Sequence, residues 1–292
     1  MPASELQLQY NSVRGYLSAI RKLFEIQQSQ GVNPAARPDG VLFKVLLQSI
    51  LRTKAFKKRQ EFADRGAGTI KDSYLPSQIP DYTAAVWKER GGRSVEGALR
   101  TQLDFLLGNH LLLRYSNRGP LELPDCFCLD LPKEGHQPGT TKCLVVILDH
   151  GKTNQHGRID YHAALRHRDP FACIVGSMAF YFFLRWQAEK REPFPSFQTN
   201  EDWYNIKVLR RSAAEYRDKA VWDEKKQKIV YEKCELSYQT AKNWTRRYHA
   251  DAGIKTSKAT HAGRVAGSQN ADAAGVAEGQ VNFSPRQVPP TR

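Results

Sequence analysis

The sequence predicts a mainly α-helical fold with a small β-hairpin or sheet, and three observations support this prediction. Apolar residues recur at three- and four-residue steps over long segments, as at Val13, Leu17 and Ile20, which is typical of helices. One continuous apolar run, at 143–148, has the length of a strand. A stretch rich in turn formers, at 149–157, separates this run from the alternating residues 158–161. The two segments are therefore predicted to form a hairpin with Lys152 at or near its tip.

Turn signals divide the helical pattern of the first part. The pattern extends from Leu6 to about Trp87 and is broken at Asn33-Pro34 and at 37–40. An apolar helix is predicted from Val41 to Leu51, and residues 91–94 have the composition of a linker. After the linker, one helix is predicted from a stripe of leucines. These leucines are Leu99, Leu103, Leu106, Leu107 and Leu111.

The second half returns to helices after the hairpin. Asp169-Pro170 predicts an N-cap and a first-turn proline for a helix at 171–189, which is apolar on nearly all sides and is therefore expected to be buried. The charged stretch near 210–235 has few apolar anchors and is predicted to be an exposed insertion. Ser237 and Gly253 are predicted to begin and end a helix at 238–252, and a shorter helix begins near His261.

This organisation predicts three parts. Residues 1–92 form a basic, helical part, and residues 93–281 form a second domain that carries the hairpin and the charged insertion. Residues 282–292 contain three of the 15 prolines and are predicted to be a disordered tail.

The composition favours a polyanionic partner. The chain has 44 Lys and Arg against 30 Asp and Glu, a formal charge of +14, so nucleic acid is the expected partner. The longest apolar run, at 171–186, falls short of the roughly 20 residues that a membrane span needs. No secretory signal is visible, and five cysteines without repeated spacing fit a reducing compartment.

Cofactor and metal sites are not predicted. Cys126, Cys128, His136 and Cys143 are metal-ligand types, but their spacing matches no common zinc pattern, so the cysteines are interpreted as buried core residues. Phosphate-binding and dinucleotide-binding glycine motifs are absent from the sequence, which argues against nucleotide hydrolysis and nicotinamide chemistry.

A basic run follows the predicted helix at 41–51 and has two interpretations. In the first, it is a solvated helix face or a weak nuclear-import signal. In the second, it is a helix that lies across DNA phosphates and contributes salt-sensitive affinity. The run contains Arg52, Lys54, Lys57, Lys58 and Arg59.

The order of these features resembles the tyrosine recombinase and integrase fold. An arginine follows an apolar helix, a lysine lies in a hairpin, and a helix opens with His-x-x-Arg. More narrowly, the segments 106–118, 151–155, 165–170 and 260–264 resemble a fungal family. That family includes the second domain of the large subunit of the yeast point-centromere DNA-binding complex and the recombinases of Crypton mobile elements. The resemblance extends from about Tyr10 to Val281.

The resemblance implies a set of phosphate-binding residues. In such recombinases, two arginines and a histidine neutralise charge on the phosphate oxygens during strand transfer, and a lysine donates a proton to the leaving hydroxyl. Arg114 corresponds to the first arginine, with Arg118 as the competing candidate. Lys152 corresponds to the hairpin lysine, and His261 and Arg264 to the second pair. All five are predicted to contact double-stranded DNA.

The sequence departs from the recombinase pattern after these residues. Recombinases carry a tyrosine nucleophile beyond the His-x-x-Arg helix, whereas no tyrosine follows Tyr248 here. A C-terminally truncated, non-catalytic recombinase-like fold is therefore predicted, acting as a nuclear DNA-binding protein. Ser284 and Thr291 lie in the proline-rich end without a visible activating base. The resemblance also implies a homodimer. Two alternatives are a truncated recombinase of a Crypton-like element and a non-catalytic scaffold or dimerisation module.

Overall fold

A computed structural model describes residues 9–38, 40–62, 66, 69, 71–88, 94–134, 139–149, 154, 157–188, 193–211, 219–223, 228–232 and 235–276. The chain divides into two compact units, 1–65 and 66–292. This division differs from the predicted boundary at residue 92, because helix α3 (Gln78–Lys88) packs with the helices of the second unit. The predicted tail at 282–292 lies outside the described residues.

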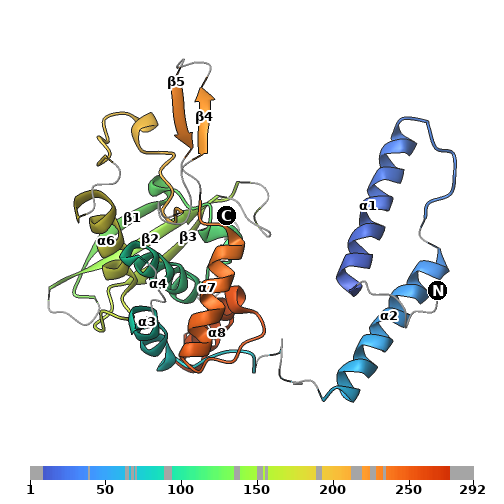
Figure 1. Ribbon diagram of the computed structural model, residues 1–292, viewed down its shortest axis with the longest axis horizontal. Coiled ribbons are helices and arrows are strands. Elements are labelled where there is room, and N and C mark those ends of the chain that lie inside the picture. Colours follow the sequence, from blue (N-terminus) through green and yellow to red (C-terminus); the bar gives the residue numbers. More distant parts are fainter. Residues whose placement is uncertain are drawn as a thin grey trace, which may run out of the picture. The chain divides into compact units, whose positions relative to one another are not determined.

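The first unit is a pair of helices, α1 (Tyr10–Ser29) and α2 (Val41–Gln60), shown in blue in Figure 1. Leu17, Phe24 and Ile50 are the buried apolar residues between them. The predicted break at Asn33 is confirmed, since its side chain accepts a hydrogen bond from the Ala35 amide at 3.0 Å and thereby forms a turn. The helix α2 runs nine residues beyond the predicted end at Leu51, so the basic run is helical.

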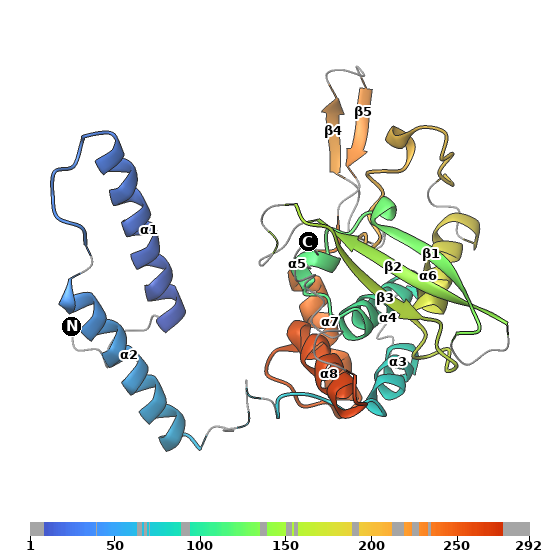
Figure 2. The ribbon, with the colours of Figure 1, turned by 180° about the vertical axis from the view of Figure 1, so that it is seen from behind.

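The second unit is built around α4 (Val95–His110). Every residue from Glu96 to Asn109 is buried, and the Ser94 hydroxyl accepts a hydrogen bond from the Gly97 amide at 3.1 Å to begin the helix. Figures 1 and 2 show this helix in the middle of the unit, with α7 (Tyr238–Asp251) and α8 (Ala259–Ala273) on one side. The short helix α5 (Tyr115–Arg118) follows α4 directly. The predicted mainly helical fold is confirmed.

A three-stranded antiparallel sheet covers the other side of α4 (Figure 2). Its strands are β1 (Cys126–Pro132), β2 (Thr140–Leu148) and β3 (Asp160–Leu165), in that order. Residue Leu148 pairs with Asp160, so β2 and β3 form the predicted hairpin. Strand β1, which pairs with the other edge of β2, was not predicted. The predicted insertion contains a separate hairpin of β4 (Lys219–Asp223) and β5 (Lys228–Glu232).

The helix α6 (Ile174–Phe183) corrects two predictions. It begins at Cys173, whose sulfur accepts a hydrogen bond from the Gly176 amide at 3.3 Å, whereas Asp169 and Pro170 belong to the preceding turn. Phe180 and Phe183 are 63% and 60% exposed, so the helix is not buried on all sides. The short helical turn η3 (Leu184–Ala188) continues it. Within the part of the chain that the structure describes, no helix combines the length and the apolar character needed to cross a bilayer.

Two further short helical turns, η2 (Leu123–Asp125) and η4 (Asn200–Asp202), complete the described elements. Buried arginines attach the segment after η4 to the core: the Arg100 guanidinium donates to the carbonyl of Arg210 at 3.0 Å, and that of Arg185 to the carbonyl of Lys207 at 3.0 Å. These bonds satisfy carbonyls that would otherwise be buried without partners.

The helix α7 has the predicted limits. The Ser237 hydroxyl accepts from the Thr240 amide at 3.2 Å, and Gly253 has a φ of 66° just after the helix, which favours glycine. Near its end, His249 is 3% exposed and lies in an aromatic cluster with ring centroids 5.3 Å from Tyr82 and 6.1 Å from Phe105. Burial lowers the pKa of His249 to about 4.

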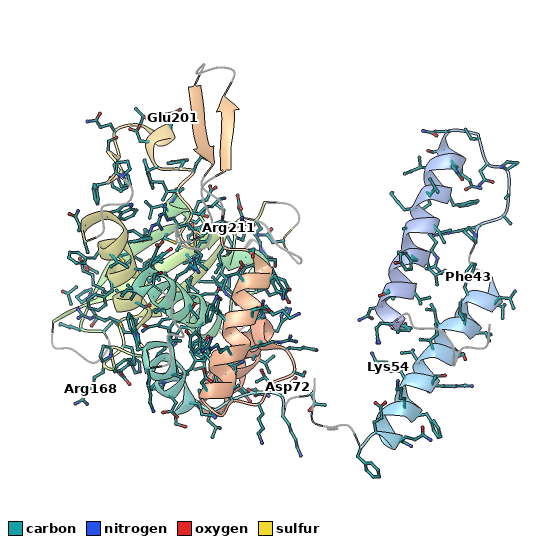
Figure 3. All side chains as sticks on the ribbon, in the orientation of Figure 1. Phe43, Lys54, Asp72, Arg168, Glu201 and Arg211 are labelled. Atoms are coloured by element: carbon teal, nitrogen blue, oxygen red, sulfur yellow. The ribbon has the colours of Figure 1, made fainter. Side chains whose placement is uncertain are left out.

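A buried carboxylate attaches the loop before α8 to the start of the second unit. Asp72, labelled in Figure 3, accepts hydrogen bonds from the Ser257 amide at 2.7 Å and from the Ser257 hydroxyl. This link holds the loop between α7 and α8 in place, so it helps to position the N-terminal turn of α8.

Candidate nucleic-acid interface

Arg118 lies inside the second unit. Its Nε donates to the Asp104 carboxylate at 2.6 Å and its Nη1 to the Leu113 carbonyl at 2.9 Å, and both ionic side chains are 3% exposed. A Cβ added at Gly108 would lie 3.3 Å from the guanidinium carbon, so Arg118 rests on bare backbone there. A buried and paired guanidinium cannot reach a phosphate at the surface. The expectation that Arg118 contacts DNA therefore does not fit its position.

Arg114 occupies the N-cap position of α5, in the loop that leaves α4. Leu111 and Leu113 anchor this loop and are each 2% exposed, whereas Leu112 and Arg114 are half-buried. The Leu112 backbone has a φ of 54°, a conformation that is costly for a residue with a side chain. The loop therefore brings the Arg114 side chain to the surface beside the α4 terminus.

His261 and Arg264 stand one turn apart on α8, so they share one face of the helix. Nη1 of Arg264 donates to the Leu112 carbonyl at 3.0 Å. Burial lowers the pKa of the Arg264 guanidinium, and the charge of Arg114 lowers it further. Arg264 and Arg114 are therefore close enough to repel each other across the Leu112 loop.

His261 is surrounded by positive charge. Partial burial lowers its pKa, and Arg114, Arg118, Lys258 and Arg264 lower it further in that order. No carboxylate is among these groups. We call Arg114, Lys258, His261 and Arg264 the cationic clamp. Lys258 was not predicted, because a single lysine before a helix carries no motif.

Two glycines on α8 allow the clamp to assemble. A Cβ at Gly263 would lie 3.0 Å from the carbonyl carbon of Gly108, and one at Gly267 would lie 2.4 Å from both the Asn109 oxygen and Leu112 Cδ2. The two glycines are four residues apart and lie on the same face of α8. The helix therefore approaches the end of α4 backbone to backbone, which brings His261 and Arg264 next to the Arg114 loop.

The family profile for the centromere DNA-binding protein complex CBF3 subunit, domain 2, matches residues 10–282. The chain belongs to this CBF3-subunit domain 2 family. Among solved structures, the XerH site-specific recombinase bound to its difH substrate in a pre-cleavage complex is similar at 10% identity, with a TM-score of 0.44. The match covers 94% of this chain and 63% of the XerH chain. No curated protein matches the sequence significantly.

The predicted basic run lies on α2 of the first unit. Arg52, Lys54, Lys57 and Arg59 are exposed, and Lys54 is labelled in Figure 3. Lys57 lies 3.6 Å from the Glu61 carboxylate, an exposed pair of small energetic value. The side chain of Lys58 lies outside the described residues.

The hairpin that carries Lys152 begins close to the clamp, although Lys152 itself lies outside the described residues. His162 on β3 connects the hairpin to the clamp. Its pKa is lowered by burial, is raised by a hydrogen bond to the Leu111 backbone and by Asp160, and is lowered by Arg264. His162 therefore lies between the Leu111–Arg114 loop and Arg264, and β3 brings the base of the hairpin to the clamp.

Two tyrosines border the clamp. The Tyr115 hydroxyl, next in sequence to Arg114, donates to the Leu236 carbonyl, and burial raises the pKa of this phenol. Tyr238, at the start of α7, is 48% exposed, and its hydroxyl lies 3.4 Å from the Thr260 hydroxyl. The rings of the two tyrosines meet edge to face with centroids 5.3 Å apart. Neither had been singled out from the sequence, where both resemble ordinary core aromatics.

Of the three cysteines expected to be buried, Cys143 is buried, Cys126 is half-buried and Cys128 is exposed, because β1 lies at the edge of the sheet; His136 lies outside the described residues. Cys126 and Cys128 lie on β1 and Cys143 on β2, all as free thiols, and burial raises the pKa of each. Among the described residues, no group of three or more His, Cys, Asp or Glu side chains is arranged to hold a metal ion.

Proposed function

We propose that this chain binds duplex DNA by holding a backbone phosphate in the cationic clamp. The observation that carries the proposal is the gathering of Arg114, Lys258 and Arg264 around His261: the Arg264 guanidinium is fixed on the Leu112 carbonyl of the Arg114 loop, and these cations lower the pKa of His261. Such a concentration of positive charge is stabilised by an anion, and the planar fork of Arg114 or Arg264 suits a phosphate. The membership in a centromere DNA-binding family supports the same partner, and we place the protein in the nucleus on that ground.

The clamp is proposed to bind DNA without cleaving it. Strand transfer needs an activated nucleophile. The Tyr115 hydroxyl donates to a carbonyl and has a raised pKa, and the Tyr238 hydroxyl lies against Thr260, so neither phenol is activated. Arg118 is buried behind the clamp and paired with Asp104, so it does not contact the bound phosphate.

The test is a fluorescence-anisotropy titration of a 25-base-pair duplex across a salt series. The logarithm of the affinity should fall with the logarithm of salt by about 0.9 for each neutralised phosphate. The Arg114→Ala/Arg264→Ala double variant should lower the affinity and reduce this slope by about 1. As a matched control, Lys133→Ala/Lys142→Ala removes the same charge from Lys133, which directly follows β1, and from Lys142 of β2, which pairs with Asp130 across the two strands. Equal losses for both double variants, or a wild-type protein without a salt slope, would contradict the proposal.

Cleavage is tested with a nicked duplex that traps covalent protein–DNA intermediates on a denaturing gel. No adduct is expected, whatever the pH. An adduct that forms with the wild type and disappears in Tyr238→Phe or Tyr115→Phe would show that one of these phenols attacks DNA, and would overturn the non-catalytic assignment.

A second proposal, self-association, rests on the first unit. Tyr16, Ile20 and Leu23 recur at four- and three-residue steps along α1 and are 60%, 48% and 55% exposed. Such an exposed apolar stripe marks an interaction surface. We propose that it pairs with a second copy of the chain. Light scattering should give a dimer mass for the wild type and a monomer mass for Ile20→Glu. A monomeric wild type at 100 times the concentration used for DNA binding would contradict this.

A further inference from the structure

A groove with mostly apolar walls lies between α4 and α6 in the second unit and has a volume of about 380 Å³. A stripe of side chains on each side forms its walls, and both stripes follow the three- and four-residue steps of a helix face. The lining residues are Val95, Leu99 and Gln102 of α4, Ser177 and Phe180 of α6, and Leu184 of η3. We call this feature the α6 groove.

The rim of the α6 groove carries aromatic side chains that are open to solvent. Phe171, Phe180 and Phe183 line the groove, and all three are exposed. Trp87 of α3 forms part of the wall, and its Nε1 donates to the Gln102 side-chain oxygen at 2.8 Å, so this wall is fixed before anything binds. A group of exposed, large apolar side chains around a preformed groove marks an interaction surface.

A buried hydroxyl at the wall of the groove lacks a partner. Among the residues that the structure describes, the Ser177 side chain is buried and its Oγ forms no hydrogen bond. Buried hydroxyls nearly always have a partner, because leaving one unpaired costs free energy. The α6 groove therefore favours an occupant that brings one polar atom on an otherwise apolar side chain.

Positive charge surrounds the groove. Lys88, the last residue of α3, and Arg168, in the turn before α6, are exposed, and Arg168 is labelled in Figure 3. Val95 is the first residue of α4, so the positive end of that helix dipole also lies at the groove. The carboxylate of Asp169 accepts a hydrogen bond from the Phe171 amide at 2.8 Å, which directs it to the backbone. Acidic groups on a partner would complement this rim.

We propose that the α6 groove binds an amphipathic helix of a partner protein, in which acidic residues flank a tryptophan anchor. Tryptophan combines a large apolar ring system with one N–H, which can donate to the Ser177 hydroxyl. From Ser177 to Ala188 the groove extends about 16 Å, or three helical turns, which suits apolar anchors at positions i, i+4 and i+7 of the partner. A second copy of the chain fits less well, because each copy carries a formal charge of +14 and would meet the cationic rim.

The α6 groove and the cationic clamp lie on different sides of the second unit. Figures 1 and 2 show α6 on the opposite side of α4 from α8, which carries His261 and Arg264. A partner helix in the groove therefore leaves the clamp open, and the chain can bind DNA and a second protein at the same time. This inference goes beyond the proposed function and does not depend on it.

The probe is a fluorescein-labelled helical peptide of about four turns, with Trp, Leu and Leu at positions i, i+4 and i+7 on a background of Glu and Ala. Fluorescence anisotropy with the full chain should show saturable binding. A peptide with Lys in place of each Glu should bind at least about tenfold more weakly. Phe180→Ala should weaken binding of the acidic peptide by at least about tenfold. As a matched control, Leu75→Ala truncates a similarly exposed apolar side chain outside the groove and should leave the affinity unchanged.

The hydroxyl contact is tested by removing each partner in turn. Ser177→Ala should weaken binding of the tryptophan peptide about 2- to 10-fold, which corresponds to one hydrogen bond. A peptide with naphthylalanine, which has two fused rings but no N–H, should bind the wild type and Ser177→Ala equally. Lys88→Ala/Arg168→Ala should weaken the acidic peptide and make its binding less sensitive to salt. Circular dichroism verifies that each variant is folded.

Three results would overturn the inference: no saturable binding of the acidic peptide, equal binding of the basic peptide, or equal affinities of Phe180→Ala and Leu75→Ala. A dimer that Phe180→Ala dissociates and Ile20→Glu does not would show that a second copy covers the groove, and would overturn it as well.

The clamp variant distinguishes this inference from the proposed function. Arg114→Ala/Arg264→Ala should bind the acidic peptide as the wild type does, and a loss there would place the peptide on the clamp and contradict the inference. A chain that binds no DNA but binds the peptide in this way would refute the clamp and leave the α6 groove standing.

Discussion

Gly267→Ala is expected to separate α8 from α4, and with it the clamp. The new Cβ would lie 2.4 Å from the Asn109 carbonyl oxygen and 2.4 Å from Leu112 Cδ2, which is closer than unbonded atoms can approach. The Asn109 oxygen belongs to backbone and cannot rotate away. Leu112 already has a φ of 54°, so its loop has little freedom to accommodate the methyl group. The helix must therefore shift, and the bond from Arg264 to the Leu112 carbonyl lengthens.

The expected change in the free energy of unfolding combines opposing effects. Alanine gains up to about 1 kcal/mol over glycine in a helix interior. Overpacking of a tight contact costs about 1–3 kcal/mol, and loss of a hydrogen bond to a charged group costs about 1.5–3 kcal/mol. The loss of the Arg264 bond is partial because the group is half-buried and water can replace the carbonyl. With about half of that bond energy lost, we expect a net destabilisation of about 1–3.5 kcal/mol.

Urea denaturation followed by circular dichroism measures this change, and the matched control is Gly176→Ala. A Cβ at Gly176 would meet only Cys173, with its sulfur 3.5 Å away, so this substitution within the same unit should be neutral or stabilising by up to about 1 kcal/mol. The affinity of Gly267→Ala for duplex DNA should also fall. If Gly267→Ala were as stable as Gly176→Ala, α8 would not be held by close backbone contact, and the explanation of how the clamp forms would fail.

Two further predictions concern pH. The pKa of His249 is about 4 in the folded state and about 6.5 in the unfolded state. The neutral, buried ring therefore contributes its full share to the free energy of unfolding above pH 6.5, and this share is lost as the pH falls toward 4, by at most about 3 kcal/mol. Urea denaturation should show this loss in the wild type and a shallower pH dependence in His249→Phe, and equal profiles would contradict the prediction. A bound phosphate should raise the lowered pKa of His261, so DNA affinity should increase as the pH falls toward 6. That increase should be absent in His261→Gln, and a parallel increase there would contradict a His261–phosphate contact.

Local pattern predicted the helices well, because each amphipathic segment buries one face. It predicted the limits of α7 because the Ser237 hydroxyl and the Gly253 backbone act locally, at the two ends of the helix. Strand β1 escaped prediction because its apolar Phe127 and Leu129 are 37% and 45% exposed, so its side-chain pattern does not reflect which face is covered. The same limit applies to the exposed face of α6, since an apolar sequence does not say which side another element covers.

The clamp residues show what a local sequence pattern cannot predict. Arg114 and Arg118 lie four residues apart in one polar segment, and sequence alone left both as candidates for the first arginine. The partner that separates them is Asp104, on the buried face of α4, which pairs with Arg118. Lys258 and Tyr238 join the site only through the packing of α7 and α8. These contacts depend on tertiary distances that no spacing in the sequence encodes.

The pairing of Arg118 with Asp104 also explains why the clamp is available to a ligand. Arg118 lies buried near His261, and its charge would be costly there without a partner. Asp104 neutralises Arg118, so the remaining positive charge is concentrated at Arg114 and Arg264, beside His261, whose pKa these charges lower. The glycine contacts between α8 and α4 hold these groups close together although they repel each other. On the proposed function, a phosphate would relieve this repulsion without any rearrangement, so the clamp would be organised for an anion before the anion arrives.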